Sequence, residues 1–149
     1  MLGETDAKLI EEFGLSPFRM KVQKVERTLI DKMFALCDYY MLGRSRRTSR
    51  HLYDIYKIAP KVEMNDGFAE LVNEVRVQRA QMGEKITPSA RPDVDVAGVA
   101  ERICEEAFYR EDYESRTMPL ISDDVSHNDV IRYYQEVMKS VFDKRAGKI

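Results

Sequence analysis

Two short clusters of polar side chains in the first half of the chain contain the residue types that bind phosphate groups. The first is Thr28-Leu29-Ile30-Asp31-Lys32. At a helix start, Thr28 would cap the backbone and Asp31 would favour the positive end of the helix dipole, so both have a structural explanation. Lys32 does not, because the dipole disfavours a cation in the first turn. There it could meet an anion gathered at the helix N-terminus.

The second cluster is Arg50-His51-Leu52-Tyr53-Asp54, which follows the arginine-rich residues 44–47. On a helix, Arg50 and Asp54 are four residues apart and therefore lie on one face. They could form a surface ion pair worth roughly 0.3–0.5 kcal/mol. Alternatively, Arg50 could fix the carboxylate of Asp54 beside a phosphate site. The sequence leaves these two interpretations open.

Residues that could hold a metal ion are scarce. The sequence has no Gly-rich phosphate loop, HExxH motif or GxSxG motif. His51 and His127 are its two histidines, and Asp93-Val94-Asp95 follows a proline and opens a helix, which favours a turn and a cap. Cys37 and Cys104 lie far apart, which excludes a disulfide framework and a zinc site as organising principles. We therefore expect no metal ligands in this chain.

Length and composition predict one soluble domain. The chain has 149 residues, of which 44% are hydrophobic and 34% charged, and no run approaches the roughly 18 apolar residues of a membrane span. We therefore expect a cytoplasmic protein without membrane segments. The net charge is −2, yet residues 18–61 contain 11 basic and 4 acidic residues. Such a basic segment is typical of proteins that bind phosphate groups or nucleic acid, although a solvated face also looks like this.

Helical periodicity dominates the chain and predicts a mainly α fold, a helical bundle of about five to six helices. Start signals accompany several of them, namely Asn65 or Asp66, Asp95, and the capping-box pair Ser126 and Asp129. The expected helices cover a short segment that ends at Gly14 and then residues 28–41, 45–59, 66 onward, 96 onward and 126–144.

Residues 18–23 depart from this pattern, because their apolar and polar side chains alternate as in a β-strand. No other segment of the chain has the pattern of a strand that could pair with this one, and an isolated strand is not stable in water. Either this stretch is not a strand, or it pairs with something outside this chain. We carry one short N-terminal strand as the prediction.

The two clusters together resemble motifs of a known family. Thr28-x-x-Asp31-Lys32 resembles the TxxEK motif of the AbiEii/AbiGii-type nucleotidyltransferase toxins, with Asp in place of Glu. Arg50-His51-x-x-Asp54 resembles the RHxxD motif that follows it in those proteins. Asp112-Tyr113-Glu114 and residues 118–125 resemble the helical C-terminal region of the family. The resemblance covers most of the chain, although only the two short motifs are specific.

The resemblance implies transfer of a nucleotidyl group from a nucleoside triphosphate, with Mg²⁺, to an RNA or protein acceptor. Carried over by motif, Lys32 would contact the triphosphate, Asp54 would be a catalytic or nucleotide-positioning carboxylate, and Arg50 would support it. Thr28 and Asp31 would shape the helix start that presents Lys32. Such chemistry depends on positioning and on charge neutralisation, for which these residue types are suited.

The sequence also departs from the family. The Gly-Ser and DxD motif that holds metal in these proteins belongs before TxxEK, and the 27 residues before Thr28 do not contain it. We therefore expect residues 1–149 to form a single helical domain like the C-terminal half of such an enzyme. It would be a shortened form, or a half that works with another chain, and in either case inactive alone and without tightly bound nucleotide or Mg²⁺. Residues 18–23 would then be the last strand of a missing N-terminal sheet.

The alternative is a non-catalytic helical module that binds RNA, another subunit or an antitoxin-like partner. Binding of nucleoside triphosphates would favour the enzyme portion. Self-association through the strand at residues 18–23 would favour the module, as would salt-sensitive RNA binding without nucleotide affinity.

Overall fold

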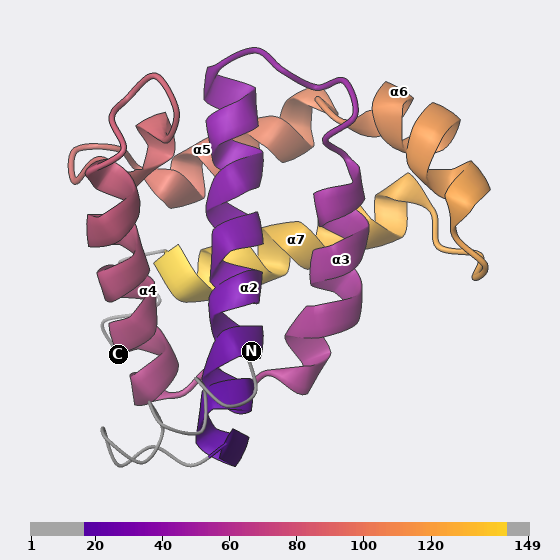
Figure 1. The fold of residues 1–149 in the computed structure, drawn as a ribbon. Helices are drawn as coiled ribbons and strands as arrows, with labels where there is room; N and C mark the ends of the chain where they lie inside the picture. Colours follow the sequence, from indigo (N-terminus) through magenta and orange to yellow (C-terminus); the bar gives the residue numbers. More distant parts are fainter. Residues whose placement is uncertain (1–16, 143–149) are drawn as a thin grey trace, which may run out of the picture.

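The computed structural model of this chain describes residues 17–142, with side chains described from residue 25 onward. These residues form helices and connecting turns and contain no strand (Figure 1), which confirms a mainly α fold. The α-helices are α2 (Pro17–Met41), α3 (Arg50–Ile58), α4 (Asp66–Ala80), α5 (Val96–Glu106), α6 (Arg110–Asp112) and α7 (His127–Phe142). Short helical turns cover Ala59–Lys61, Pro88–Ala90, Tyr113–Thr117 and Met118–Leu120. None of the described helices has the length and apolarity needed to cross a membrane.

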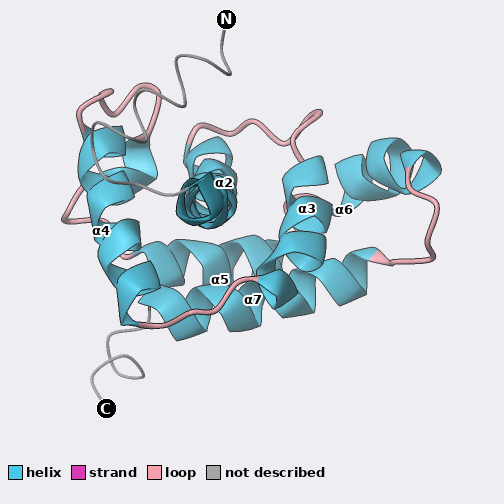
Figure 2. Ribbon diagram, turned by 60° about the horizontal axis from the view of Figure 1, so that its bottom comes forward, coloured by secondary structure: helices cyan, strands magenta, loops and turns pink. Residues whose placement is uncertain are grey.

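The long helix α2 is the centre around which the other helices pack. Figure 2 views it end-on, with α4 on one side, α3 on the other, and α5 and α7 crossing below. Several side chains of α2 are fully buried: Leu29, Ile30, Met33, Phe34, Leu36 and Cys37. Burial of such side chains is the main favourable term in folding, so α2 supplies the core that holds the outer helices.

Three helix starts that the sequence predicts are confirmed. The side chain of Asn65 accepts a hydrogen bond from the backbone N–H of Phe68, and Asp95 accepts one from Gly98. Ser126 and Asp129 bond each other reciprocally, with each backbone N–H 3.2 Å from the other side chain. Each of these helices buries one apolar face: Phe68, Leu71, Val72 and Val75 in α4, Val96, Val99, Ala100 and Ile103 in α5, and Val130, Tyr134, Val137 and Met138 in α7.

Two helix boundaries differ from the prediction. α2 already begins at Pro17, so Thr28 does not cap a helix and Lys32 does not lie in a first turn. The reason is that residues 18–41 contain no Gly or Pro, and nothing interrupts the helix at Thr28. The argument from the helix dipole is therefore wrong for Lys32. The next helix begins at Arg50 instead of Ser45, because the preceding residues form a turn.

Other predictions concern residues near the ends of the chain. Residues 18–23 lie in the first turns of α2, where we expected a short strand. Their side chains lie outside the described part, so no contact is assigned to them. The helix expected to end at Gly14 and the last residues of the helix over 126–144 also lie outside the described residues.

A buried carboxylate joins α2 to α4 and to the turn before α5. Asp38 of α2 is only 2% exposed. One of its oxygens lies 2.7 Å from Nη2 of Arg79 on α4, and the other accepts hydrogen bonds from the backbone N–H and the hydroxyl of Ser89. Nη1 of Arg79 also lies 3.2 Å from Oδ1 of Asp31, which is two helical turns before Asp38 on α2. These contacts fix the position of α4 along α2.

We expect Asp38→Ala to lower the free energy of unfolding by about 3 kcal/mol, because it removes the buried partner of Arg79 and the acceptor for Ser89. Urea denaturation followed by far-UV circular dichroism measures this loss. Asp31→Ala is the matched control, since it removes a half-exposed carboxylate from the same guanidinium and is expected to cost less than about 1 kcal/mol. Equal losses in the two variants would contradict the role assigned to Asp38.

Candidate functional site

A cleft of about 530 Å³ lies between α2, α3 and α4. It contains the first polar cluster, because Thr28, Asp31 and Lys32 all line it, and it contains one residue of the second cluster, His51. Two arginines from different helices complete its polar lining, Arg27 on α2 and Arg79 on α4. Three predicted site residues therefore share one cleft, although they lie in the middle of a long helix instead of at its start.

An ion pair joins the two sequence clusters at this cleft. Nζ of Lys32 lies 3.0 Å from Oδ2 of Asp54, and the two side chains are 21% and 25% exposed. Asp54 thus pairs with a residue of another helix. The ion pair of Asp54 with Arg50 that we considered is absent among the described side chains. Packing of α3 on α2 turns Asp54 towards Lys32, whereas Arg50 is exposed.

His51 contributes a neutral aromatic ring to the cleft. It stacks on Tyr39, with ring centroids 5.8 Å apart and an angle of 19° between the planes. Burial and the nearby charge of Lys32 lower the pKa of His51 below its ordinary value of 6.5, so the ring is neutral at pH 7. Within the described structure, its Nδ1 atom is buried without a hydrogen-bond partner. The ring therefore packs against Tyr39 and lines the cleft.

Two further cations in the cleft escaped the sequence analysis. Arg79 is held by Asp31 and Asp38 and lies over the ring of Phe34, while Arg27 hydrogen-bonds the side chain of Gln78. Together with Lys32 they give the cleft three cationic groups, of which Lys32 is paired with Asp54 and Arg79 with Asp31 and Asp38. The cleft therefore offers an anion ammonium and guanidinium donors whose charge is partly compensated within the fold. The sequence shows that α4 carries arginines, but it does not show which of them face α2.

A second buried carboxylate sets the start of α3. Arg47 has a left-handed backbone conformation, with φ of 66°. Asp112, which lies in the segment that resembles the family's C-terminal region, stabilises this turn. It accepts hydrogen bonds from the backbone N–H groups of Arg47 and Ser49, at 2.7 and 3.1 Å, and from the Ser49 hydroxyl at 2.6 Å. Because Asp112 holds residues 47–49 in a turn, the helix begins at Arg50.

The environment of Asp112 favours its charged form. Burial alone would raise the pKa of this carboxyl, but the hydrogen bonds from Ser49 and Arg47 and the nearby charge of Arg116 outweigh burial and lower the pKa below 3.8. The carboxylate is therefore ionised under ordinary conditions. Its charge is compensated within the fold.

Arg50 faces a different pocket. This second pocket, of about 250 Å³, is lined by Arg47, Arg50, Arg116, Thr117, Leu120 and Ile121, together with Asp112. The RHxxD-like cluster is therefore divided between two places. His51 lines the cleft and Asp54 holds Lys32, whereas Arg50 points to the other pocket. The expectation that Arg50 supports Asp54 does not agree with this geometry.

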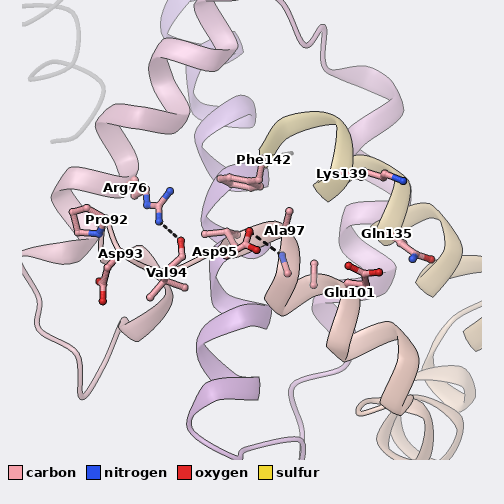
Figure 3. A pocket seen from close by; sticks show the side chains of 13 residues that line it. Arg76, Pro92, Asp93, Val94, Asp95, Ala97, Glu101, Gln135, Lys139 and Phe142 are labelled. Atoms are coloured by element: carbon pink, nitrogen blue, oxygen red, sulfur yellow. Dashed lines mark hydrogen bonds between the residues drawn. The ribbon is translucent and has the colours of Figure 1, made fainter. Parts of the chain in front are cut away.

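The Asp93-Val94-Asp95 sequence lies in a third pocket, shown in Figure 3. Asp95 caps α5, and Asp93 forms an ion pair of 3.5 Å with Arg91. Arg76 of α4 donates to the carbonyl oxygen of Val94 and so fixes this turn. The preference for a turn and a cap is therefore confirmed for these residues. Across the described residues, no group of three or more His, Cys, Asp or Glu side chains could hold a metal ion.

Comparison with known proteins gives one family. The family described as "Nucleotidyl transferase AbiEii toxin, Type IV TA system" matches residues 5–142, which is most of the chain. The matched region includes both polar clusters, the cleft and the segment around Asp112. No curated protein and no solved structure matches the chain.

We expect Lys32 and Asp54 to be coupled in stability by about 0.5–1 kcal/mol, as is typical of a partly exposed ion pair. A double-mutant cycle with Lys32→Met and Asp54→Asn, measured by urea denaturation, gives this value. The pair Lys57–Asp123 is a suitable control because its side chains are more exposed, at 49% and 36%. A coupling no larger than that of the control would show that Lys32 is not held by Asp54.

Substitution of Asp112 should have a pH-dependent effect. Because its folded-state pKa is lowered, the stabilisation is complete above the ordinary pKa and is lost as the pH falls through the folded-state value. We expect Asp112→Asn to cost about 2 kcal/mol at pH 7 and less below about pH 4. Unfolding by urea across this pH range tests it. If the difference in unfolding free energy between the unaltered chain and Asp112→Asn stays constant with pH, Asp112 does not have a lowered pKa in the folded state.

Proposed function

The chain belongs to the AbiEii family of nucleotidyl transferase toxins, and we propose that its helices form the part of such an enzyme that binds the nucleoside triphosphate. The ion pair between Lys32 and Asp54 is the observation that carries this proposal. It joins the two clusters that resemble the family motifs, although they lie on different helices. It does so beside a cleft that is rich in cations.

In this proposal, Lys32 contacts the triphosphate. Its ammonium lies beside the cleft, is partly exposed, and has Arg27 and Arg79 as cationic neighbours. A triphosphate carries several negative charges, so a cleft with three cations compensates it better than any one residue could. Thr28 and Asp31 line the same cleft, and Asp31 helps to place Arg79.

Asp54 acts in this proposal as a nucleotide-positioning carboxylate. It fixes the ammonium of Lys32 before the ligand arrives, which reduces the entropy that binding would otherwise cost. The uncharged ring of His51 fills the space beside this pair without adding a charge that would repel Lys32. We do not assign Arg50 to this cleft, because it faces the second pocket.

Nucleotidyl transfer in this family implies a nucleoside triphosphate and Mg²⁺, which neutralises charge on the phosphates. The described residues offer no set of three ligands for the ion. We therefore assign magnesium to none of them and derive no step through it. We further propose that these helices bind the nucleotide and do not carry out the transfer alone.

The acceptor and the partner follow from the family in the same way. We propose an RNA or protein acceptor for the nucleotidyl group, and an antitoxin as the partner, because the family is described as part of a type IV toxin–antitoxin system. A cytoplasmic location agrees with the two free thiols, Cys37 and Cys104, which would be kept reduced there.

Thermal denaturation with each nucleoside triphosphate, with and without Mg²⁺, tests the proposal. A ligand at about 100 times its dissociation constant stabilises the folded state by roughly 2.7 kcal/mol, which such a scan detects. We expect this stabilisation with the unaltered chain and its loss in Lys32→Ala. Lys57→Ala is the matched control, since it also removes a lysine from an ion pair with an aspartate, but outside the cleft.

Three results are informative. A shift that disappears in Lys32→Ala and persists in Lys57→Ala supports nucleotide binding at the cleft. A shift that persists in both variants contradicts the role of Lys32. If no nucleotide gives a shift with the unaltered chain, the helical interaction module replaces the nucleotide-binding proposal.

A further inference from the structure

The turn before α3 carries an unusual concentration of unpaired positive charge. Arg44, Arg46, Arg47 and Arg50 lie within seven residues and are all exposed. None of their side chains forms an ion pair with any carboxylate in residues 25–142. Like charges held close together repel each other, so an anion bound among them would be stabilised.

Two of these arginines belong to the second pocket. Arg47 and Arg50 line it from the turn and from the first residue of α3, and Arg116 lines it from the other side. We call this site, with Thr117, Leu120 and Ile121, the arginine pocket. Leu120 is 76% exposed, so the pocket opens to solvent on an apolar edge.

The carboxylate in the arginine pocket does not cancel its charge. Asp112 lines the pocket, is largely buried, and already accepts hydrogen bonds from Ser49 and from the backbone of Arg47. Nε of Arg116 lies 3.4 Å from Oδ1 of the same carboxylate, and this ion pair holds the guanidinium at its Nε end. The two terminal nitrogens of Arg116 form no ion pair or hydrogen bond with another described residue. The pocket therefore keeps donors from three guanidinium groups.

We propose that the arginine pocket binds a phosphate group and that it is separate from the cleft of Lys32. Guanidinium groups donate two parallel hydrogen bonds to phosphate oxygens, which a single ammonium cannot do. Asp112 holds the turn at Arg47, from which two of these groups extend. Arg50 then has a function that does not require contact with Asp54.

The position of the pocket would place its phosphate next to the triphosphate that the proposed function assigns to the cleft. Arg50 and His51 are consecutive residues at the start of α3, and they line the arginine pocket and the cleft respectively. The phosphate group has two sources, the backbone of an RNA strand or a free nucleotide. Both offer the same chemistry to arginine, and the following experiment separates them.

The test measures two ligands with the full chain. Fluorescence anisotropy follows a labelled single-stranded RNA of mixed sequence at several salt concentrations, and thermal denaturation follows nucleoside triphosphates. The variants are Arg50→Gln, Arg50→Lys and the double variant Arg47→Gln/Arg50→Gln. Arg132→Gln on α7 is the matched control, because it removes one exposed arginine that has no ion pair in the described structure and lies outside the pocket.

We expect Arg50→Gln to weaken binding of one of the two ligands about five- to tenfold relative to Arg132→Gln. Arg50→Lys should restore part of the lost affinity, since lysine keeps the positive charge but cannot donate two parallel hydrogen bonds. Weaker RNA binding identifies a phosphate of the RNA strand. The slope of the logarithm of the binding constant against the logarithm of the salt concentration should then be smaller by about one. A smaller nucleotide shift in Arg50→Gln than in Arg132→Gln, with unchanged RNA affinity, identifies a free nucleotide.

If neither ligand binds more weakly in the double variant than in Arg132→Gln, the arginine pocket is not a phosphate site. This outcome is independent of the proposed function, which depends on Lys32→Ala. Conversely, if nucleotides bind Lys32→Ala as well as the unaltered chain, the cleft is not the nucleotide site. The arginine pocket is then tested by the Arg50 variants alone.

Discussion

The buried contact between Asp38 and Arg79 is the constraint on which the cleft depends. A carboxylate that is 2% exposed is costly to bury unless its partners are well placed, and here Arg79 and Ser89 satisfy both oxygens. Because these partners come from α4 and from the turn before α5, the contact fixes both segments against α2. The same guanidinium reaches Asp31, so one wall of the cleft is set by a residue of the core.

The opposite wall depends on a second buried carboxylate. Asp112 holds the turn over residues 47–49 and therefore decides where α3 begins. The starting point fixes the register of the helix, since each residue turns the side chain by about 100°. In this register, His51 faces the cleft, Asp54 meets Lys32 and Arg50 faces the arginine pocket. These adjacent residues thus contribute to both the cleft and the arginine pocket because α3 begins at Arg50.

Local signals predict much of the fold but only part of the site. Asn65, Asp95 and Ser126 mark helix starts because a cap acts within its own turn, and the structure confirms all three. Thr28 and Asp31 have the same pattern as a cap, yet α2 passes through them, and Asp31 pairs with Arg79, 48 residues away. The site depends on such distant contacts. The sequence therefore indicates Lys32 and Asp54 through motifs, but it gives no sign of Arg79 or of the second pocket.

The partial exposure of the Lys32–Asp54 ion pair suits a ligand-binding site better than a contact that stabilises the fold. A partly exposed ion pair contributes about 0–1 kcal/mol to stability. The ammonium of Lys32 has three N–H donors, so it can donate to a phosphate while it keeps its contact with Asp54. Both side chains are partly exposed, at 21% and 25%, so a ligand can reach the pair. In the proposed function, Asp54 acts on the nucleotide through the position it gives to Lys32, without touching the phosphates itself.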